Sequence, residues 1–139
     1  MVTFNAGIHD LARGQEWLSL QDYAALMDDV TERLVAVAGQ SVVFVTTTPV
    51  PTNASDPSTA ACPEGILDRD VVAYNAAAVA IAAAHKIAVL DLHQVVVAAC
   101  GGNGYSTCAI QEPENPHFLD KGWALLATAV ANAVTAAVT

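Results

Sequence analysis

The sequence contains few basic residues. Only 5 of its 139 residues are Lys or Arg, against 14 Asp and Glu, which gives a formal net charge of −9. Without a basic patch to neutralise phosphate groups, this composition argues against nucleic acids and anionic membrane surfaces as partners. Charged residues make up only 14% and hydrophobic residues 54% of the chain, which argues against disorder. We expect one domain that spans residues 1–139.

No signal peptide and no membrane span are predicted. A segment led by Lys or Arg and followed by an apolar stretch does not open the chain. The two longest apolar stretches, Val71–Leu92 and Trp123–Val138, are rich in alanine and are interrupted by polar residues. Buried helices and a strand explain both stretches better than bilayer spans do.

The three cysteines lack the spacing of a zinc site. No second Cys or His pair accompanies Cys62, Cys100 or Cys108 at the distance along the chain that zinc ligands require. Cys100 and Cys108 flank a glycine-rich stretch, which favours a small disulfide-closed loop. A disulfide predicts an oxidising compartment, and the glycosylation sequon at Asn53 points the same way. We therefore expect a secreted protein or one in the secretory-pathway lumen; two free thiols and an unused sequon are the alternative.

Strands and helices are predicted to alternate along the chain. Three apolar runs are predicted to be strands: Val2–Phe4, Ser41–Thr47 and Ile87–Leu90. The second is continuous, which is typical of a strand that is buried on both faces. Three segments with helical spacing of apolar residues are predicted to be helices: the segment from its N-cap Ser19 to Gly39, Asp70–Ala84, and about Asp120–Val138. A short helical piece is expected after the third strand. This order predicts an α/β fold, with a parallel sheet of about three strands between helices on both faces.

Polar side chains follow all three predicted strands, in the segments 7–10, 46–51 and 91–93. The carboxyl ends of parallel strands meet at one edge of a sheet, where ligands bind in folds of this kind. A loop with Glu114 and His117 precedes the last helix and can reach the same edge. The long proline-rich loop 48–69 also begins there, and loops of this length are usually functional. The sequence therefore predicts a site at this edge.

Two segments resemble motifs of the SGNH (GDSL-type) hydrolases. Glu114-Asn115-Pro116-His117-Phe118, with an apolar helix after it, is similar to the block in which an acid-x-x-His loop supplies the base and the orienting carboxylate of a serine esterase. Phe4-Asn5-Ala6-Gly7-Ile8-His9-Asp10-Leu11 is similar to the Gly-x-Asn-Asp block, with a histidine where asparagine is usual. The resemblance covers nearly the whole chain. It implies a truncated doubly wound, flavodoxin-like three-layer sandwich and an enzyme that acts on carboxylic (acyl or acetyl) esters.

The resemblance also assigns roles to individual residues. His117 would be the general base, and Glu114 the carboxylate that orients it. Gly7 and His9 would lie in the oxyanion hole, with Asp10 beside them. For His117 the alternative is helix capping, and for His9 it is a hydrogen bond within its own loop. No cofactor and no metal are implied.

The sequence departs from this pattern at the nucleophile. The Gly-Asp-Ser block and the second oxyanion glycine are absent, because the chain begins at what resembles the third strand of the family. No Ser, Thr or Cys stands in a replacement motif; Thr46 and Thr47 lie at the correct edge, but nothing beside them activates a hydroxyl. A complete serine triad cannot be built from these residues.

Three functions remain open at this point. The first is a truncated SGNH-type esterase, or one that another polypeptide completes. The second is a non-catalytic binding module for acyl or glycan ligands. The third is a metal site built from His9, Asp10, His93 and His117. In each case the strand Val2–Phe4 would lack its usual inner neighbour, so we expect a homo-oligomer or a partner chain across this edge of the sheet.

Overall fold

The computed structural model describes residues 1–12, 17–53, 55–56, 58–101 and 108–138. Its sheet has three parallel strands in the order β1 (Val2–Phe4), β2 (Val42–Val45) and β3 (Ala88–Leu90). Phe44 of the central strand pairs with Phe4 on one side and with Val89 on the other. The predicted parallel α/β sheet is confirmed, and each strand begins within one residue of its predicted start.

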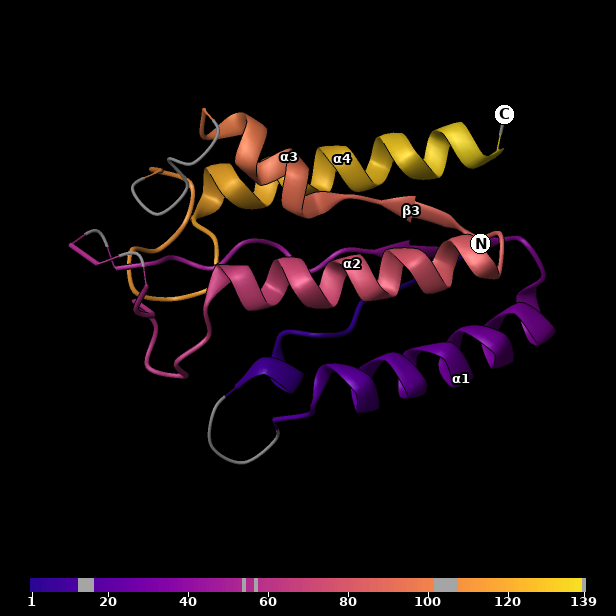
Figure 1. Ribbon diagram of the computed structural model, residues 1–139. Coiled ribbons are helices and arrows are strands. Elements are labelled where there is room, and N and C mark those ends of the chain that lie inside the picture. Colours follow the sequence, from indigo (N-terminus) through magenta and orange to yellow (C-terminus); the bar gives the residue numbers. More distant parts are fainter. Residues whose placement is uncertain (13–16, 54, 57, 102–107, 139) are drawn as a thin grey trace.

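One face of the sheet is covered by α1 (Leu20–Ala38) and α2 (Asp68–Ala84) (Figure 1). The helix α1 begins where predicted, because Ser19 Oγ accepts the Asp22 backbone N–H at 3.1 Å. It ends at Gly39, whose φ of +60° suits glycine. The helix α2 begins two residues before its predicted start, at the buried Asp68, whose carboxylate accepts the Val50 N–H at 3.1 Å. The larger core, which includes Tyr23, Phe44 and Val71, lies in this layer.

The other face is covered by α3 (Leu92–Ala99) and α4 (Asp120–Val138). Asp91 caps α3 by accepting the Gln94 N–H at 3.0 Å. Because successive side chains of β2 point to opposite faces, Val45 packs into a second, smaller core with Leu92, Val96, Phe118 and Leu126. Helices therefore lie on both faces of the sheet, as predicted. The described helices include none whose length and hydrophobicity would let it cross a bilayer.

Cys100 and Cys108 form a disulfide, which confirms the prediction, while Cys62 is a buried free thiol. The glycine-rich residues 102–107 between the two half-cystines lie outside the described residues. The disulfide joins the C-terminal end of α3 to the segment that leads to His117. It thereby shortens the free chain that carries this histidine.

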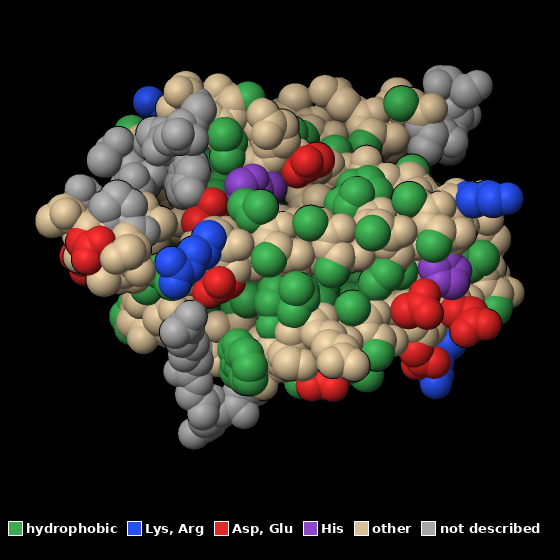
Figure 2. All heavy atoms as spheres, in the orientation of Figure 1, with side chains coloured by type: hydrophobic (Ala, Val, Ile, Leu, Met, Phe, Trp, Pro, Cys, Tyr) green, Lys and Arg blue, Asp and Glu red, His purple; other side chains and the backbone are tan. Residues whose placement is uncertain are grey.

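The surface is mixed in character. On the face shown in Figure 2, basic side chains stand apart from one another, and hydrophobic side chains lie exposed along the middle of the molecule. Val72 and Val79 of α2 are 48% and 37% exposed. At the first strand, Val2 is 37% exposed, and β1 is an edge strand of the sheet.

Candidate functional site

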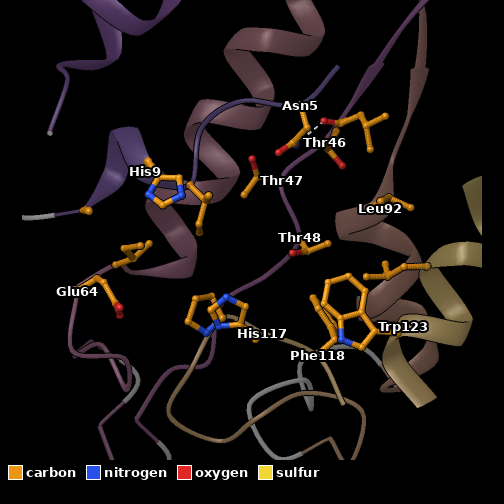
Figure 3. A pocket seen from close by; sticks show the side chains of 16 residues that line it. Asn5, His9, Thr46, Thr47, Thr48, Glu64, Leu92, His117, Phe118 and Trp123 are labelled. Atoms are coloured by element: carbon orange, nitrogen blue, oxygen red, sulfur yellow. Dashed lines mark hydrogen bonds between the residues drawn. The ribbon is translucent and has the colours of Figure 1, made fainter. Parts of the chain in front are cut away.

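A pocket of about 350 Å³ opens at the carboxyl ends of β1 and β2 (Figure 3). Its walls come from the loop after β1, the segment after β2, the long loop before α2, and the region around the start of α4. The lining residues that matter below are Asn5, His9, Thr48, Glu64, His117 and Trp123. The predicted site edge is therefore hollow, and segments far apart in the sequence meet there.

The loop after β1 is held by hydrogen bonds to its neighbours. Asn5 Nδ2 donates to the Val45 carbonyl at 2.7 Å. The Ala6 carbonyl accepts from both Tyr23 Oη and Thr47 Oγ1, each at 3.1 Å. Burial, followed by the charge of Asp10 and the proximity of Tyr74, raises the pKa of Tyr23, so that its hydroxyl remains a donor.

Gly7 turns this loop towards the pocket. Its φ of +136° is a conformation that other residues rarely adopt, and a Cβ there would meet Thr47 Oγ1 at 2.9 Å. The 3₁₀ turn η1 (His9–Leu11) follows directly, and the sequence pattern had not predicted it. Together they place His9 in the pocket wall, whereas Asp10, in the same turn, is not among the residues that line the pocket.

The segment after β2 contributes three threonines, two of which have structural partners. Thr46 Oγ1 donates to Asp91 Oδ1 at 2.9 Å, and Thr47 Oγ1 binds the Ala6 carbonyl. Asp91, at the end of β3, is thus a structural acceptor, which also accepts the Gln94 N–H. Thr48 also lines the pocket (Figure 3). Among the described residues that line the pocket there is no serine and no cysteine.

Asn115 orients His117. The Asn115 Oδ1 atom accepts the His117 backbone N–H at 3.0 Å and also contacts His117 Nδ1. A backbone N–H can only donate, so the Asn115 atom that faces it is the carbonyl oxygen, and Nδ1 must carry the proton. In this tautomer His117 Nε2 has a free lone pair, which a general base requires.

The segment before His117 is itself anchored in the fold. Gln111 is buried, and its Nε2 donates to the carbonyls of Pro49 and Pro116, at 2.8 and 3.2 Å. An antiparallel bridge joins Gln111 to Phe118. Glu114 lies on the exposed side of this turn, and among the described residues the partner of Nδ1 is Asn115. The role of Glu114 as the orienting acid stays a prediction.

The structure thus brings together some of the predicted residues and leaves others apart. His9 and His117 share one pocket, although 108 positions separate them in the sequence. His93 instead pairs with the buried Asp68 at 3.2 Å and lines a separate cavity of about 210 Å³. In the part of the chain that the structure describes, no group of three or more His, Cys, Asp or Glu residues could hold a metal ion.

The sequence motifs assign no role to several residues that line the pocket, among them Asn5, Thr48, Glu64 and Trp123. Glu64 had a signal, because it lies in the long loop for which a functional role was expected. Trp123 begins the apolar stretch Trp123–Val138, for which a buried helix was expected, yet it is 55% exposed. An exposed tryptophan at the mouth of a pocket can be distinguished from a core residue only once the packing is known.

No protein-family model matches this chain, and no curated protein matches it in sequence. Solved structures do match. A GDSL-like lipase from Bacteroides thetaiotaomicron superposes with a TM-score of 0.73 at 18% identity, covering 99% of this chain and 62% of the lipase. A lipase/acylhydrolase from Enterococcus faecalis superposes with a TM-score of 0.68 at 16% identity, covering 96% and 60%.

The fold is therefore that of the GDSL-like lipases and acylhydrolases, as the sequence motifs indicated. The chain spans less than two thirds of the length of either structure. At these sequence identities the likeness concerns the fold, and the chemistry must be argued from the site.

Proposed function

We propose that this chain forms the histidine-bearing part of an SGNH-type hydrolase that acts on carboxylic esters, acyl or acetyl. His117 is the general base, and His9 and Gly7 contribute to the oxyanion hole. The observation that supports this most is the shared pocket, in which His9 and His117 border a largely apolar cavity. Asn115 holds His117 in the tautomer whose Nε2 can accept a proton. A cavity of this size, mostly apolar with a few convergent polar groups, is typical of a small-molecule site.

The proposed chemistry requires a hydroxyl nucleophile. His117 Nε2 would take the proton of that hydroxyl while its oxygen bonds to the ester carbonyl carbon, and would then deliver the proton to the departing alcohol. The carbonyl oxygen gains the negative charge in between, and the His9 ring N–H is the donor proposed to stabilise it. We propose that the nucleophile is a serine from polypeptide outside these 139 residues.

The alternative is a non-catalytic binding module for acyl or glycan ligands. The absence of serine and cysteine from the described lining of the pocket favours it. Both functions use the same pocket, so that hydrolysis and binding must be measured separately.

The open edge of β1 is the proposed attachment point for a second chain, either another copy or a different partner. Edge strands with unpaired backbone groups and exposed apolar side chains invite strand pairing, and Val2 and Met1 are 37% and 50% exposed there. A stable monomer in size-exclusion chromatography with light scattering would refute this proposal. The disulfide is compatible with an extracellular location, and we propose secretion or residence in the secretory-pathway lumen.

Hydrolysis of p-nitrophenyl butyrate, measured with this chain in the presence of the polypeptide that supplies the serine, tests the function. His117→Ala should lower the rate by about 100-fold or more, the usual contribution of a general base. His85→Ala is the matched control, because His85 lies at the far end of α2, where it pairs with Asp28 at 2.7 Å. Equal rates for the two variants would refute the role of His117.

Two further results discriminate among the proposed functions. Saturable binding of an acyl amide without any hydrolysis would favour the binding module. A hydrolytic activity that Thr48→Ala abolishes would show that the pocket supplies its own hydroxyl, against the proposal of an external serine.

A further inference from the structure

The pocket is lined mostly by apolar residues, and its aromatic side chains lie on one side. In Figure 3, His9 and Glu64 lie on one side and Leu92, Phe118 and Trp123 on the other, with His117 between them. Leu126 completes the apolar side. An ester whose carbonyl lies beside the two histidines would therefore direct its more apolar group towards the start of α4.

Two aromatic rings form the centre of this apolar side. The ring centroids of Phe118 and Trp123 are 6.2 Å apart, and the ring planes meet at 68°, an edge-to-face arrangement. Phe118 is only 6% exposed and belongs to the core that α3 and α4 share. Trp123 is 55% exposed, so that much of its ring surface is available to a ligand.

Gly122 permits the close approach of the two rings. A Cβ at this position would lie 2.3 Å from the Ile110 carbonyl oxygen and 2.7 Å from Phe118 Cδ1. The first turn of α4 can approach Phe118 this closely only because residue 122 has no side chain. The backbone N–H of Trp123 also donates to the Leu119 carbonyl at 2.9 Å. Phe118 and Trp123 together form what we call the aromatic wall. Backbone packing fixes this wall before any ligand arrives, which lowers the free-energy cost of ordering it on binding.

We propose that this wall makes the pocket selective for esters of aromatic carboxylic acids, whose flat acyl group packs against Trp123 and Phe118. This inference rests on the proposed function, because it assigns the acyl group of the substrate to the apolar side. An aromatic ring gains favourable quadrupole contacts with the two side chains beyond the burial of its area. A saturated ring of similar size gains only the burial. The expected preference for the aromatic acyl group is about two- to tenfold in Kd.

The experiment compares benzamide with cyclohexanecarboxamide, two neutral amides that differ in the aromaticity of the ring. Their Kd values are measured by NMR titration of the unmodified protein and of two variants, Trp123→Leu and Trp17→Leu. Trp17 is the matched control, because it is 60% exposed and is not among the residues that line the pocket. We expect the unmodified protein and Trp17→Leu to bind benzamide two- to tenfold more tightly, and Trp123→Leu to bind both amides equally.

Two outcomes would overturn the inference and leave the proposed function in place. One is equal binding of the two amides by the unmodified protein, and the other is a benzamide preference that survives in Trp123→Leu. Failure of both amides to bind would overturn both proposals. Trp123→Met provides a second apolar, non-aromatic replacement if Trp123→Leu does not fold, and the same loss of preference is expected.

Discussion

Asn75 binds both polar groups of the Thr47 backbone. The Thr47 N–H donates to Asn75 Oδ1 at 2.9 Å, and Asn75 Nδ2 donates to the Thr47 carbonyl at 2.8 Å. Both residues are buried, at 8% and 5% exposure. Thr47 in turn binds the Ala6 carbonyl, so that a side chain of α2 determines where the loop carrying Gly7 and His9 lies.

Replacement of Asn75 by leucine should destabilise the protein by about 3 kcal/mol, because two buried backbone groups lose their partners. Urea denaturation followed by circular dichroism measures this change. Asn132→Ala is the matched control, an asparagine on the exposed side of α4, with an expected change below about 0.5 kcal/mol. Equal stabilities for the two variants would show that the two hydrogen bonds between Asn75 and the Thr47 backbone do not stabilise the fold.

The structure and the family resemblance differ on which residue orients His117, Asn115 or Glu114. The structure predicts that Asn115→Ala releases the ring and populates the other tautomer, whereas the family resemblance predicts that Glu114→Gln has the greater effect. Nitrogen-15 NMR of the imidazole ring distinguishes Nδ1–H from Nε2–H directly. We expect the Nδ1–H form in the unmodified protein and in Glu114→Gln, and a mixture in Asn115→Ala. A tautomer change confined to Glu114→Gln would restore the acid–histidine pair.

The disulfide should contribute about 2–3 kcal/mol to the free energy of unfolding, since it restricts the unfolded chain over a short loop. The double variant Cys100→Ser, Cys108→Ser should lose this amount in urea denaturation, and reductant should have no further effect on it. In denaturant without reductant, one thiol per chain should react, that of Cys62. In the folded protein this thiol should react slowly, because burial raises the pKa of Cys62. Three reactive thiols would contradict the bond.

Tyr23 makes stability depend on alkaline pH. Its pKa is raised in the fold, mainly by burial, so the folded state keeps a proton that the unfolded chain releases near about pH 10. The stabilisation is complete below that pH and is lost as the pH rises further, towards the folded pKa. Tyr23→Phe should therefore flatten the decline of stability above about pH 10. Some slope should remain, since the pKa of Tyr74 is raised as well.

The same Tyr23→Phe variant should cost about 1 kcal/mol at neutral pH, because the hydrogen bond to the Ala6 carbonyl is lost. Thermal unfolding at pH 7 and at several values above pH 9 measures both effects. Identical alkaline slopes for the variant and the unmodified protein would show that Tyr23 does not carry the dependence.

Local sequence signals were enough to predict most of the architecture. The Ser19 cap and Gly39 bounded α1 correctly, because capping depends on residues within one turn of each other. The continuous apolar run around Val42–Val45 identified the central strand, because a strand covered on both faces has no polar side to reveal. At Asp68, by contrast, the helix starts before its predicted start. The Asp68 carboxylate binds the Val50 N–H at the other end of the loop that precedes the helix, and no local pattern encodes that contact.

Periodicity and residue chemistry were sufficient to predict the parallel α/β sheet and the candidate histidines, and the short glycine-rich stretch favoured the Cys100–Cys108 disulfide. Which polar groups contact one another, by contrast, depends on the packing of the folded chain. In the structure, His117 contacts Asn115, and His93 pairs with Asp68 outside the pocket. Trp123 lines the mouth of the pocket. Such pairings depend on how the helices pack against the sheet, where shifts of an ångström change the partner, and one-dimensional patterns do not resolve them.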